Sequence, residues 1–379
     1  MIMSDKLNVK LAVIGANEPL LSYYKQAKAL GCRIYGFAWE KGAVCRDYCE
    51  KFYPISFTEK EKILEICRNE KIDGITSFSL ESALPTVIYV AQNLGLVSNT
   101  EECMSLTKDK FTMRERLKVC NVPIPGYRHI SELKELEGLQ LDYPLIVKPS
   151  DSGGSKGVAL AHNDKELKDA FNRAVQFSIS GTVMVEEYVD GREFSVEYIS
   201  HKGMHFFLQI TDKVTSGPPY FVELQHHQPA DLTTEQENSI KAVVEATLDA
   251  LKITDSPSHT ELKMKDDGDI RIIELGARMG GGYITSDLVR LSTGYDFVKG
   301  NIELVTGHFS KPIKTAQNYS GVYFLSSQTK EKVMPYLTHP QNYPWIIQSE
   351  VIDDNPQFAT NNGERSGYLI YQSDKKVIL

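Results

Sequence analysis

Hydrophobic and polar positions alternate in blocks over residues 9–100. Short apolar runs, which are typical of buried strands, are each followed by a stretch with helical spacing of apolar positions. Strand–helix alternation of this kind predicts a parallel, doubly wound sheet. The predicted strands are Val9–Ala16, Cys32–Trp39 and Asp73–Ser79, and the predicted helices are Pro19–Leu30, Lys60–Lys71 and Glu81–Leu94.

Beyond residue 108 the pattern changes to short strands joined by glycine-rich or Asp-Gly turns, which favours antiparallel hairpins. The clearest hairpin has Asp266-Asp267-Gly268-Asp269 between two apolar strands, Ser258–Lys265 and Ile270–Leu275. Further predicted strands are Leu145–Lys148, Gly157–Ala161, Thr182–Val189 and Glu193–Ser200, and the predicted helices are Asp109–Cys120, Lys165–Phe177 and Thr234–Leu251. Beyond residue 305, a small C-terminal β-lobe is predicted from Gly321–Ser326, Trp345–Val351 and Gly367–Gln372.

Length and charge narrow the classes of protein that fit. A chain of 379 residues exceeds one ordinary core and predicts two or three domains. The 42 basic and 50 acidic residues give a net charge of −8, with no dense basic cluster. We therefore expect neither nucleic-acid nor anionic-membrane binding. No apolar run approaches the ~18 residues of a membrane helix, and no signal peptide is evident, so we expect a soluble, cytoplasmic protein.

Three further motifs argue against other chemistries. The six cysteines lack metal-site spacing, which favours reduced, packed thiols. The first strand–helix turn, Gly15-Ala16-Asn17-Glu18-Pro19, lacks the glycine pattern of a dinucleotide-binding enzyme. His226 and His227 have no evident third ligand, so a surface or loop position is favoured over a zinc site.

A strand that delivers Lys148 is followed by a loop rich in glycine and serine, Ser150–Gly157. Glycine lets backbone N–H groups approach a phosphate closely. The loop is no Walker A motif, because no Gly-Lys-Ser/Thr opens a helix. We interpret it as a hairpin flap over a triphosphate; the alternative is a solvated, mobile hairpin.

Two pairs of acids add to this pattern. Glu186 and Glu193 flank an Asp-Gly turn, where a hinge residue and a carboxylate could recognise adenine and ribose, although exposed acids of a hairpin are an alternative. Glu261 and Glu274 fall on the two strands of the predicted hairpin and can face the same way. Mg²⁺ takes carboxylate oxygens together with ATP phosphates. A salt bridge from Glu274 to Arg271 or Arg278 is the competing interpretation.

Together these residues resemble the ATP-grasp superfamily, in matching order over nearly the whole chain. The resemblance implies ATP and Mg²⁺ as cofactors and an α/β fold, α+β in the ATP-binding region. The implied domains are a pre-ATP-grasp domain at 1–108, an ATP-binding region at 109–305 with a small lobe at about 121–187, and a β-lobe at 306–379. It is compatible with a homodimer.

The resemblance also implies roles for single residues. Lys110 and Lys148 would hold the ATP phosphates, and Glu261 and Glu274 would bind Mg²⁺. Glu186 would meet the adenine amino group, Val189 the ring through its backbone, and Glu193 the ribose. The flap residues that would cover the phosphates are Ser152, Gly153, Gly154, Ser155 and Gly157.

One departure concerns Gly276, because many members carry asparagine two residues beyond the second metal acid. The segment Glu274–Gly282 instead resembles the branch of L-amino-acid ligases and carbamoyl-phosphate-synthetase-like enzymes, in which an arginine faces the substrate. Arg278 is the counterpart of this arginine. Arg278 and Lys148 are the predicted catalytic residues. The other predicted substrate residues are Glu81, His259 and Gly281, and the run Gly280-Gly281-Gly282 could leave room for an amino-acid backbone. Glu81 could equally cap a helix, and His259 could equally be a packed side chain.

The predicted function is a Mg-ATP-dependent, ADP-forming carboxylate–amine ligase. It would activate an amino acid as an acyl phosphate and join it to an amine, which gives a dipeptide or an amino-acid conjugate. One alternative is a purine-pathway or carbamoyl-phosphate-like enzyme that phosphorylates formate, bicarbonate or carbamate. The other is a catalytically silent ATP-binding protein, which the presence of Lys110, Lys148, Glu261 and Glu274 disfavours.

Overall fold

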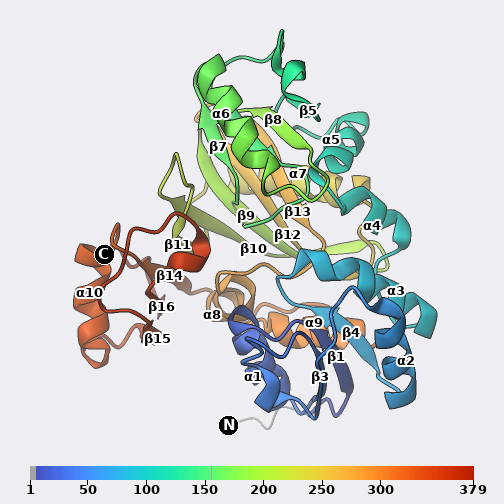
Figure 1. The fold of residues 1–379 in the computed structure, drawn as a ribbon. Helices are drawn as coiled ribbons and strands as arrows, with labels where there is room; N and C mark the ends of the chain where they lie inside the picture. The colour runs from blue at the N-terminus through green and yellow to red at the C-terminus, as the bar shows by residue number, and fades with distance from the viewer. Residues whose placement is uncertain (1–5, 155) are drawn as a thin grey trace.

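The structure is a computed structural model that describes residues 6–154 and 156–379 (Figure 1). Within these ranges the chain forms three β-sheets with helices packed on them. The sheets draw their strands from successive parts of the chain, residues 10–77, 127–187 and 192–373. The predicted mixed α/β fold is thereby confirmed.

The first sheet is parallel, with strand order β3-β2-β1-β4, as the strand–helix alternation predicts. Its central strand β1 is buried on both faces. Leu11 and Val13 pack in the core that contains α1, whereas Ala12 and Ile14 pack in the core that contains α2 and α3. The elements are β1 (Lys10–Ile14), α1 (Leu21–Ala29), β2 (Arg33–Phe37), β3 (Lys51–Tyr53), α2 (Lys60–Glu70), β4 (Gly74–Ser77) and α3 (Leu84–Leu94).

A helix from much later in the chain also covers this sheet. Phe297 and Ile302 of α9 (Phe297–Val305) belong to the same hydrophobic core as Leu11 and Val13. Asn301 of this helix donates to the Tyr23 hydroxyl over 3.1 Å. The first sheet is therefore packed tightly against α9. This packing positions β4 and α3 beside the candidate site.

The second sheet is a small antiparallel lobe with strand order β5-β8-β6-β7. Helix α6 buries Leu167 and Phe171 against it. The helix begins after Asn163, whose side chain accepts from the N–H groups of Lys165 and Glu166. The elements are β5 (Tyr127–Ile130), β6 (Leu145–Pro149), β7 (Ala159–Ala161), α6 (Asp164–Val175) and β8 (Val183–Glu187).

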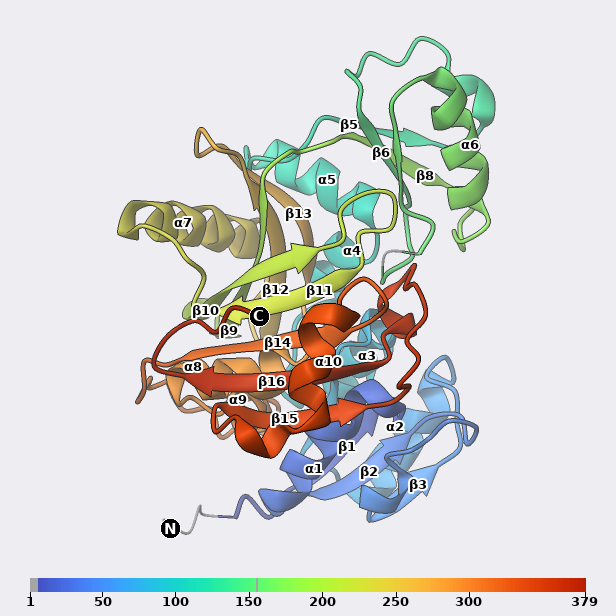
Figure 2. The ribbon, with the colours of Figure 1, turned by 90° about the vertical axis from the view of Figure 1, so that its left-hand side faces the viewer.

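The third sheet is antiparallel, with strand order β13-β12-β9-β10-β11-β14-β16-β15. The C-terminal strands do not form a sheet of their own, because β14 pairs with β11 and extends the same sheet (Figure 2). Its strands are β9 (Arg192–His201), β10 (Met204–Thr215), β11 (Glu223–Gln228), β12 (Ser256–Met264), β13 (Ile270–Gly276), β14 (Tyr319–Leu325), β15 (Ile346–Val351) and β16 (Gly367–Ser373).

The remaining helices cover the third sheet or link the domains. Helices α5 and α7 bury Leu117, Ile240 and Val244 in the core beneath β9, β12 and β13. Among the described residues, no helix is both long and apolar enough to cross a membrane. These helices are α4 (Glu101–Thr107), α5 (Lys110–Val119), α7 (Thr234–Ala250), α8 (Val289–Thr293) and α10 (Lys330–Thr338).

Helix α7 begins with a capping box, whose contribution to the stability of the fold can be measured. The Thr233 hydroxyl accepts from the Gln236 N–H over 3.2 Å, and the Gln236 side chain accepts from the Thr233 N–H over 3.0 Å. Thr233→Ala is expected to lower the free energy of unfolding by about 1 kcal/mol in urea titrations. Ser239→Ala, which removes an exposed hydroxyl from the same helix, is the matched control; equal effects of the two changes would contradict the capping role.

Candidate active site

Two acidic side chains lie opposite each other on the hairpin of β12 and β13. Glu261 and Glu274 are cross-strand partners because the register shifts between Glu261 and Leu262; continued unchanged from the pair Leu262–Ile272, the register would set Glu261 opposite Ile273. Paired residues of antiparallel strands point to the same face of the sheet. Their side chains are 26% and 31% exposed, so both carboxylates reach accessible space.

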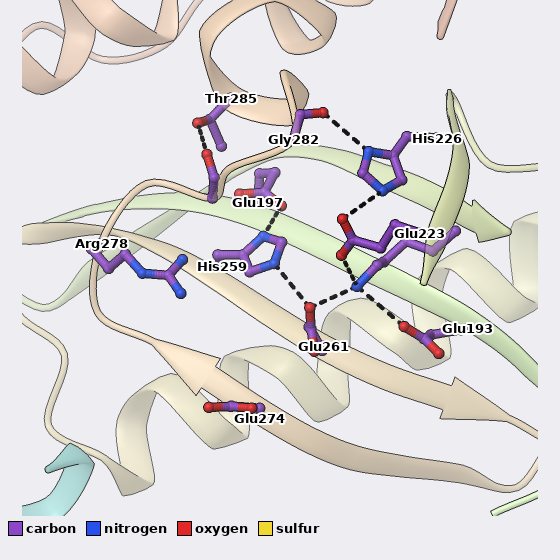
Figure 3. A network of polar contacts seen from close by, with 12 residues as sticks. Glu193, Glu197, Glu223, His226, His259, Glu261, Glu274, Arg278, Gly282 and Thr285 are labelled. Atoms are coloured by element: carbon purple, nitrogen blue, oxygen red, sulfur yellow. Dashed lines mark hydrogen bonds and ion pairs between the residues drawn. The ribbon is translucent and has the colours of Figure 1, made fainter. Parts of the chain in front are cut away.

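A buried lysine joins one of these acids to two others. Lys213 of β10 is 2% exposed, and its Nζ lies 2.6 Å from Glu261 and 3.1 Å from both Glu193 and Glu223. These glutamates converge on one point in Figure 3. Burial would lower the pKa of Lys213, but the three carboxylates together raise it well above its usual range. The sequence analysis missed Lys213; its one signal is a lone lysine inside a strand-like run, Leu208–Val214.

The charges and donor types of this cluster suit a hard cation. Three carboxylates around one ammonium leave excess negative charge, and carboxylate oxygens are ligands that Mg²⁺ accepts. Among the described residues, no group of three or more His, Cys, Asp or Glu side chains is placed to hold a metal ion. Two protein carboxylates, Glu261 and Glu274, fit a Mg²⁺ that takes its other ligands from phosphates and water.

Lys110 links Glu274 to the start of the glycine-rich loop. Its Nζ donates to the Ser152 carbonyl over 2.7 Å and lies 3.2 Å from Glu274 Oε1. Burial would lower the pKa of Lys110, but the Glu274 carboxylate outweighs that effect and raises it. The alternative salt bridges of Glu274 do not form, because Arg271 pairs with Asp269 and Arg278 pairs with Glu81.

Lys148 and Glu186 meet inside the small lobe, together with Arg114. Glu186 accepts from Arg114 Nε over 2.9 Å and from Lys148 Nζ over 2.7 Å, and all three side chains are more than nine-tenths buried. Burial lowers the pKa of Lys148. Burial would raise the pKa of Glu186, but Arg114 and Lys148 hold it at about 2. Sequence reasoning missed Arg114, which lies on α5 far from the motif it serves.

The glycine-rich loop is anchored at one end and open in the middle. Asp151 accepts from the N–H groups of Ile179 and Ser180. A Cβ at Gly153 or Gly154 would meet no atom within 4 Å. Ser155 lies outside the described residues, and Gly157 has φ +73°, which favours glycine. The described part of the loop is thus open at Gly153 and Gly154, and whether it covers a phosphate stays a prediction.

The segment between β8 and β9 carries the other predicted nucleotide contacts. Val189 is buried, with 5% of its surface exposed, so its side chain can form part of an apolar wall. Glu193 begins the strand that also carries Glu197, and its carboxylate is held by Lys213. The structure thus places Glu193 on the same charged cluster as Glu261.

His259 is bound on both ring nitrogens. Its Nδ1 lies 2.6 Å from the fully buried carboxylate of Glu197, and its Nε2 lies 3.4 Å from Glu261 (Figure 3). Burial would lower the pKa of His259, but Glu197 and Glu261 raise it to about 9. An imidazolium held in this way orients Glu261 and adds positive charge beside it.

Arg278 and Glu81 bring the first domain to the same site. Arg278 Nη2 lies 3.2 Å from Glu81 Oε2, and Arg278 Nε is buried with no partner among the described residues. Burial raises the pKa of Glu81, although Arg278 opposes this shift. A guanidinium with an unused N–H donor can bind an anionic group of a substrate.

The glycine run after Arg278 has a different physical reason from the predicted one. A Cβ at Gly280 would lie 2.4 Å from His259 Nδ1, and one at Gly281 would lie 2.6 Å from Ser79 Oγ. Protein side chains therefore fill the space that we expected for an amino-acid backbone. The run lets three segments of the fold approach one another at this site.

The expected surface or loop position of His226 and His227 is wrong. Both lie on β11 and are at most 2% exposed. His226 Nδ1 lies 3.1 Å from the Gly282 carbonyl, and its Nε2 lies 3.4 Å from Glu223 Oε2. Burial lowers the pKa of His227 to about 3, so this imidazole is neutral. As neighbours on a strand the two histidines point to opposite faces, and both faces are covered: His226 packs on Phe324, and His227 packs on Tyr323 and Tyr371.

Comparison with known proteins agrees with this geometry. Residues 141–287 match the family model of the ATP-grasp domain. The predicted resemblance to the ATP-grasp superfamily is thereby confirmed over this segment. The matched segment includes Lys148, the glycine-rich loop, both acids of the hairpin and Arg278.

The chain is also similar to curated relatives. It is 22% identical over 60% of its length to an L-arginine-specific L-amino acid ligase of Bacillus subtilis, covering 56% of that protein. It is 26% identical over 49% of its length to dapdiamide A synthase of Enterobacter agglomerans, covering 45% of it. It is 27% identical over 41% of its length to a carbamoyl phosphate synthase large chain of Clostridium botulinum, covering 15% of that protein. The chain thus spans about half or less of these relatives.

Two solved structures share the fold over nearly the whole chain. The L-amino acid ligase from Bacillus licheniformis aligns with a TM-score of 0.81 and 23% identity, covering 97% of this chain and 94% of that one. An ADP complex of N5-carboxyaminoimidazole synthetase from Staphylococcus aureus aligns with a TM-score of 0.77 and 16% identity, covering 98% and 95%. At these identities the likeness concerns the fold.

Proposed function

We propose that this protein is a Mg-ATP-dependent carboxylate–amine ligase that activates an amino acid and joins it to an amine. The observation that carries the proposal is the pairing of Glu261 with Glu274 beside Lys110 and Lys213. Carboxylates for a cation and ammonium groups for phosphates stand within one site. The relatives that act on amino acids, by their names, support the amino-acid substrate.

When bound, Mg-ATP supplies the phosphoryl group that activates the substrate carboxylate. The side chains of this chain bind and orient the reactants. Lys110 and Lys148 neutralise phosphate charge, and Glu261 and Glu274 hold the cation. The loop at 150–157 covers the phosphates and keeps water from the activated acid.

The second half of the proposed reaction joins the activated acid to the amine. The amine nitrogen forms a bond to the acyl carbon, the carbon–oxygen bond to phosphate breaks, and the nitrogen loses a proton. In this proposal the Arg278 guanidinium orients the acid and stabilises negative charge on its oxygens. Glu81 holds Arg278 from the side of the first domain.

The test is a screen for nucleotide turnover. The purified protein is incubated with Mg-ATP and each amino acid, alone and in pairs, while release of ADP and phosphate is measured. We expect ADP and phosphate to form only with particular amino acids. AMP and pyrophosphate as products would contradict the acyl-phosphate mechanism. If ATP turnover occurs with bicarbonate or formate but with none of the amino acids tested, the proposed substrate is wrong.

A further inference from the structure

A mostly buried arginine near the site has no use in the roles described above. Arg365 follows the short 3₁₀ helix Asn362–Glu364, and its side chain is 18% exposed. A guanidinium has five N–H donors and stays charged in proteins. None of the five makes a hydrogen bond to the described residues, and Nη1 is fully buried. Such a group is expected to have an anionic partner.

The acid beside Arg365, Glu223, already has other partners. Glu223 Oε2 is 3.5 Å from Arg365 Nη1, beyond good hydrogen-bond distance. The same carboxylate lies 3.1 Å from Lys213 Nζ and 3.4 Å from His226 Nε2. Arg365 therefore lies beside this carboxylate without a hydrogen bond to it, and its N–H donors stay unused by the described residues.

The position of Arg365 is fixed by its neighbours. Its guanidinium stacks on the Phe324 ring, with 3.7 Å between the guanidinium carbon and the ring centroid. The Asn362 side chain accepts from the Glu223 N–H over 2.9 Å, which ties the loop to β11. A guanidinium held by stacking and a tethered loop loses little freedom when it binds an anion.

Arg365 also lies at the opposite end of the glycine run from Arg278. A Cβ at Gly282 would be 2.7 Å from His226 Cε1 and 3.6 Å from Glu223 Oε2, the oxygen that faces Arg365. Through Glu223 and Lys213, Arg365 is linked to Glu261 of the proposed cation site. Two arginines from different parts of the chain thus bracket the segment 279–282.

We infer that Arg365 binds the carboxylate of the amine substrate, in a subsite separate from the one that Arg278 serves. This inference rests on the proposed ligase function and specifies it further. The amine substrate is then itself an amino acid, and the product keeps a free carboxylate. Planar, bidentate recognition explains why an arginine is suited to this position.

The experiment separates activation of the acid from binding of the amine. Hydroxylamine, which has no carboxylate, traps an activated acid as a hydroxamate and reports the first half of the reaction. Amino acids are then tested as the second substrate, and the one that gives the fastest phosphate release is chosen. The KM of this amino acid is compared with the KM of its primary amide. Arg365→Met is expected to raise the KM of the amino acid roughly 10- to 100-fold, the loss expected for charge-assisted hydrogen bonds. The KM of the amide and the rate of hydroxamate formation should stay within about twofold.

Two further variants keep the test decisive. Arg365→Lys retains the charge but not the bidentate geometry, so its effect should be intermediate. Arg46→Met removes an arginine that also stacks on an aromatic ring, Phe52, on the first domain, and should change neither KM. Thermal unfolding of each variant shows whether the fold is retained.

The possible results are distinguishable. If wild-type protein forms no hydroxamate with any acid, the proposed function is overturned and this inference with it. Suppose that hydroxamate forms, but that Arg365→Met and Arg365→Lys either raise the KM of the amino acid and that of its amide equally or leave both unchanged. Then only the role of Arg365 is overturned. A selective rise for the amino acid supports it.

Discussion

Replacing Glu274 with glutamine is expected to lower the rate of amino-acid-dependent ADP release about 100- to 1,000-fold. The change keeps the shape of the side chain but removes the negative charge that faces Glu261 across the hairpin. A bound cation contributes several kcal/mol to stabilising transferred charge, so its loss affects the rate strongly. The concentration of Mg²⁺ that gives half-maximal rate should rise as well.

Binding provides a second measurement for the same variant. In titration calorimetry, Glu274→Gln should weaken Mg-ADP binding more than it weakens binding of ADP with EDTA present. Asp266→Asn removes a charge from the exposed turn of the same hairpin and serves as the matched control. If Glu274→Gln and Asp266→Asn have the same Mg²⁺ dependence as the wild type, Glu274 does not hold the cation.

Glu186→Gln is expected to lower the free energy of unfolding by about 3–5 kcal/mol at neutral pH, because it breaks a buried ion pair. The substitution leaves Arg114 and Lys148, which are both buried, without their shared carboxylate. Two like charges would then lie together in a region with little water. Urea unfolding measures the loss, and Glu137→Gln, an exposed acid of the same lobe, is the control.

The contribution of Glu186 also predicts a dependence on pH. Burial would raise the pKa of Glu186, but Arg114 and Lys148 hold it at about 2 in the folded chain, below its ordinary value of about 4.3. Its stabilising effect is therefore complete above about pH 4.3 and declines as the pH falls toward 2. The stability difference between wild type and Glu186→Gln should shrink over this range. A constant difference would contradict the ion-pair explanation.

Local patterns in the sequence predicted much of the fold. The strand–helix alternation of residues 9–100 corresponds to the parallel sheet, because strands buried on both faces must be apolar throughout. The Asp266–Asp269 turn predicted the hairpin of β12 and β13, but Glu261 lies opposite Glu274 only because the register shifts between Glu261 and Leu262, which the sequence does not show. Helices such as Thr234–Ala250 begin at capping residues that are visible in the sequence.

Contacts between distant segments could not be predicted in this way. Lys213, Arg114 and Arg365 are unremarkable in the sequence, and their importance comes from the carboxylates that the fold brings to them. Helix α9 was missed, although it buries a face of the first domain. His226 and His227 looked exposed, because no local pattern shows that β11 is an interior strand.

By itself, then, the sequence determined the elements, the position of the hairpin turn and the residue types that suit phosphate and cation binding, since these depend on neighbours along the chain. The tertiary structure decided which charges share a site. It placed Lys213 among three glutamates, buried Glu186 between two cations and set Arg365 beside the glycine run. Burial and opposing charge act through space, so they follow from packing between segments that are far apart in the sequence.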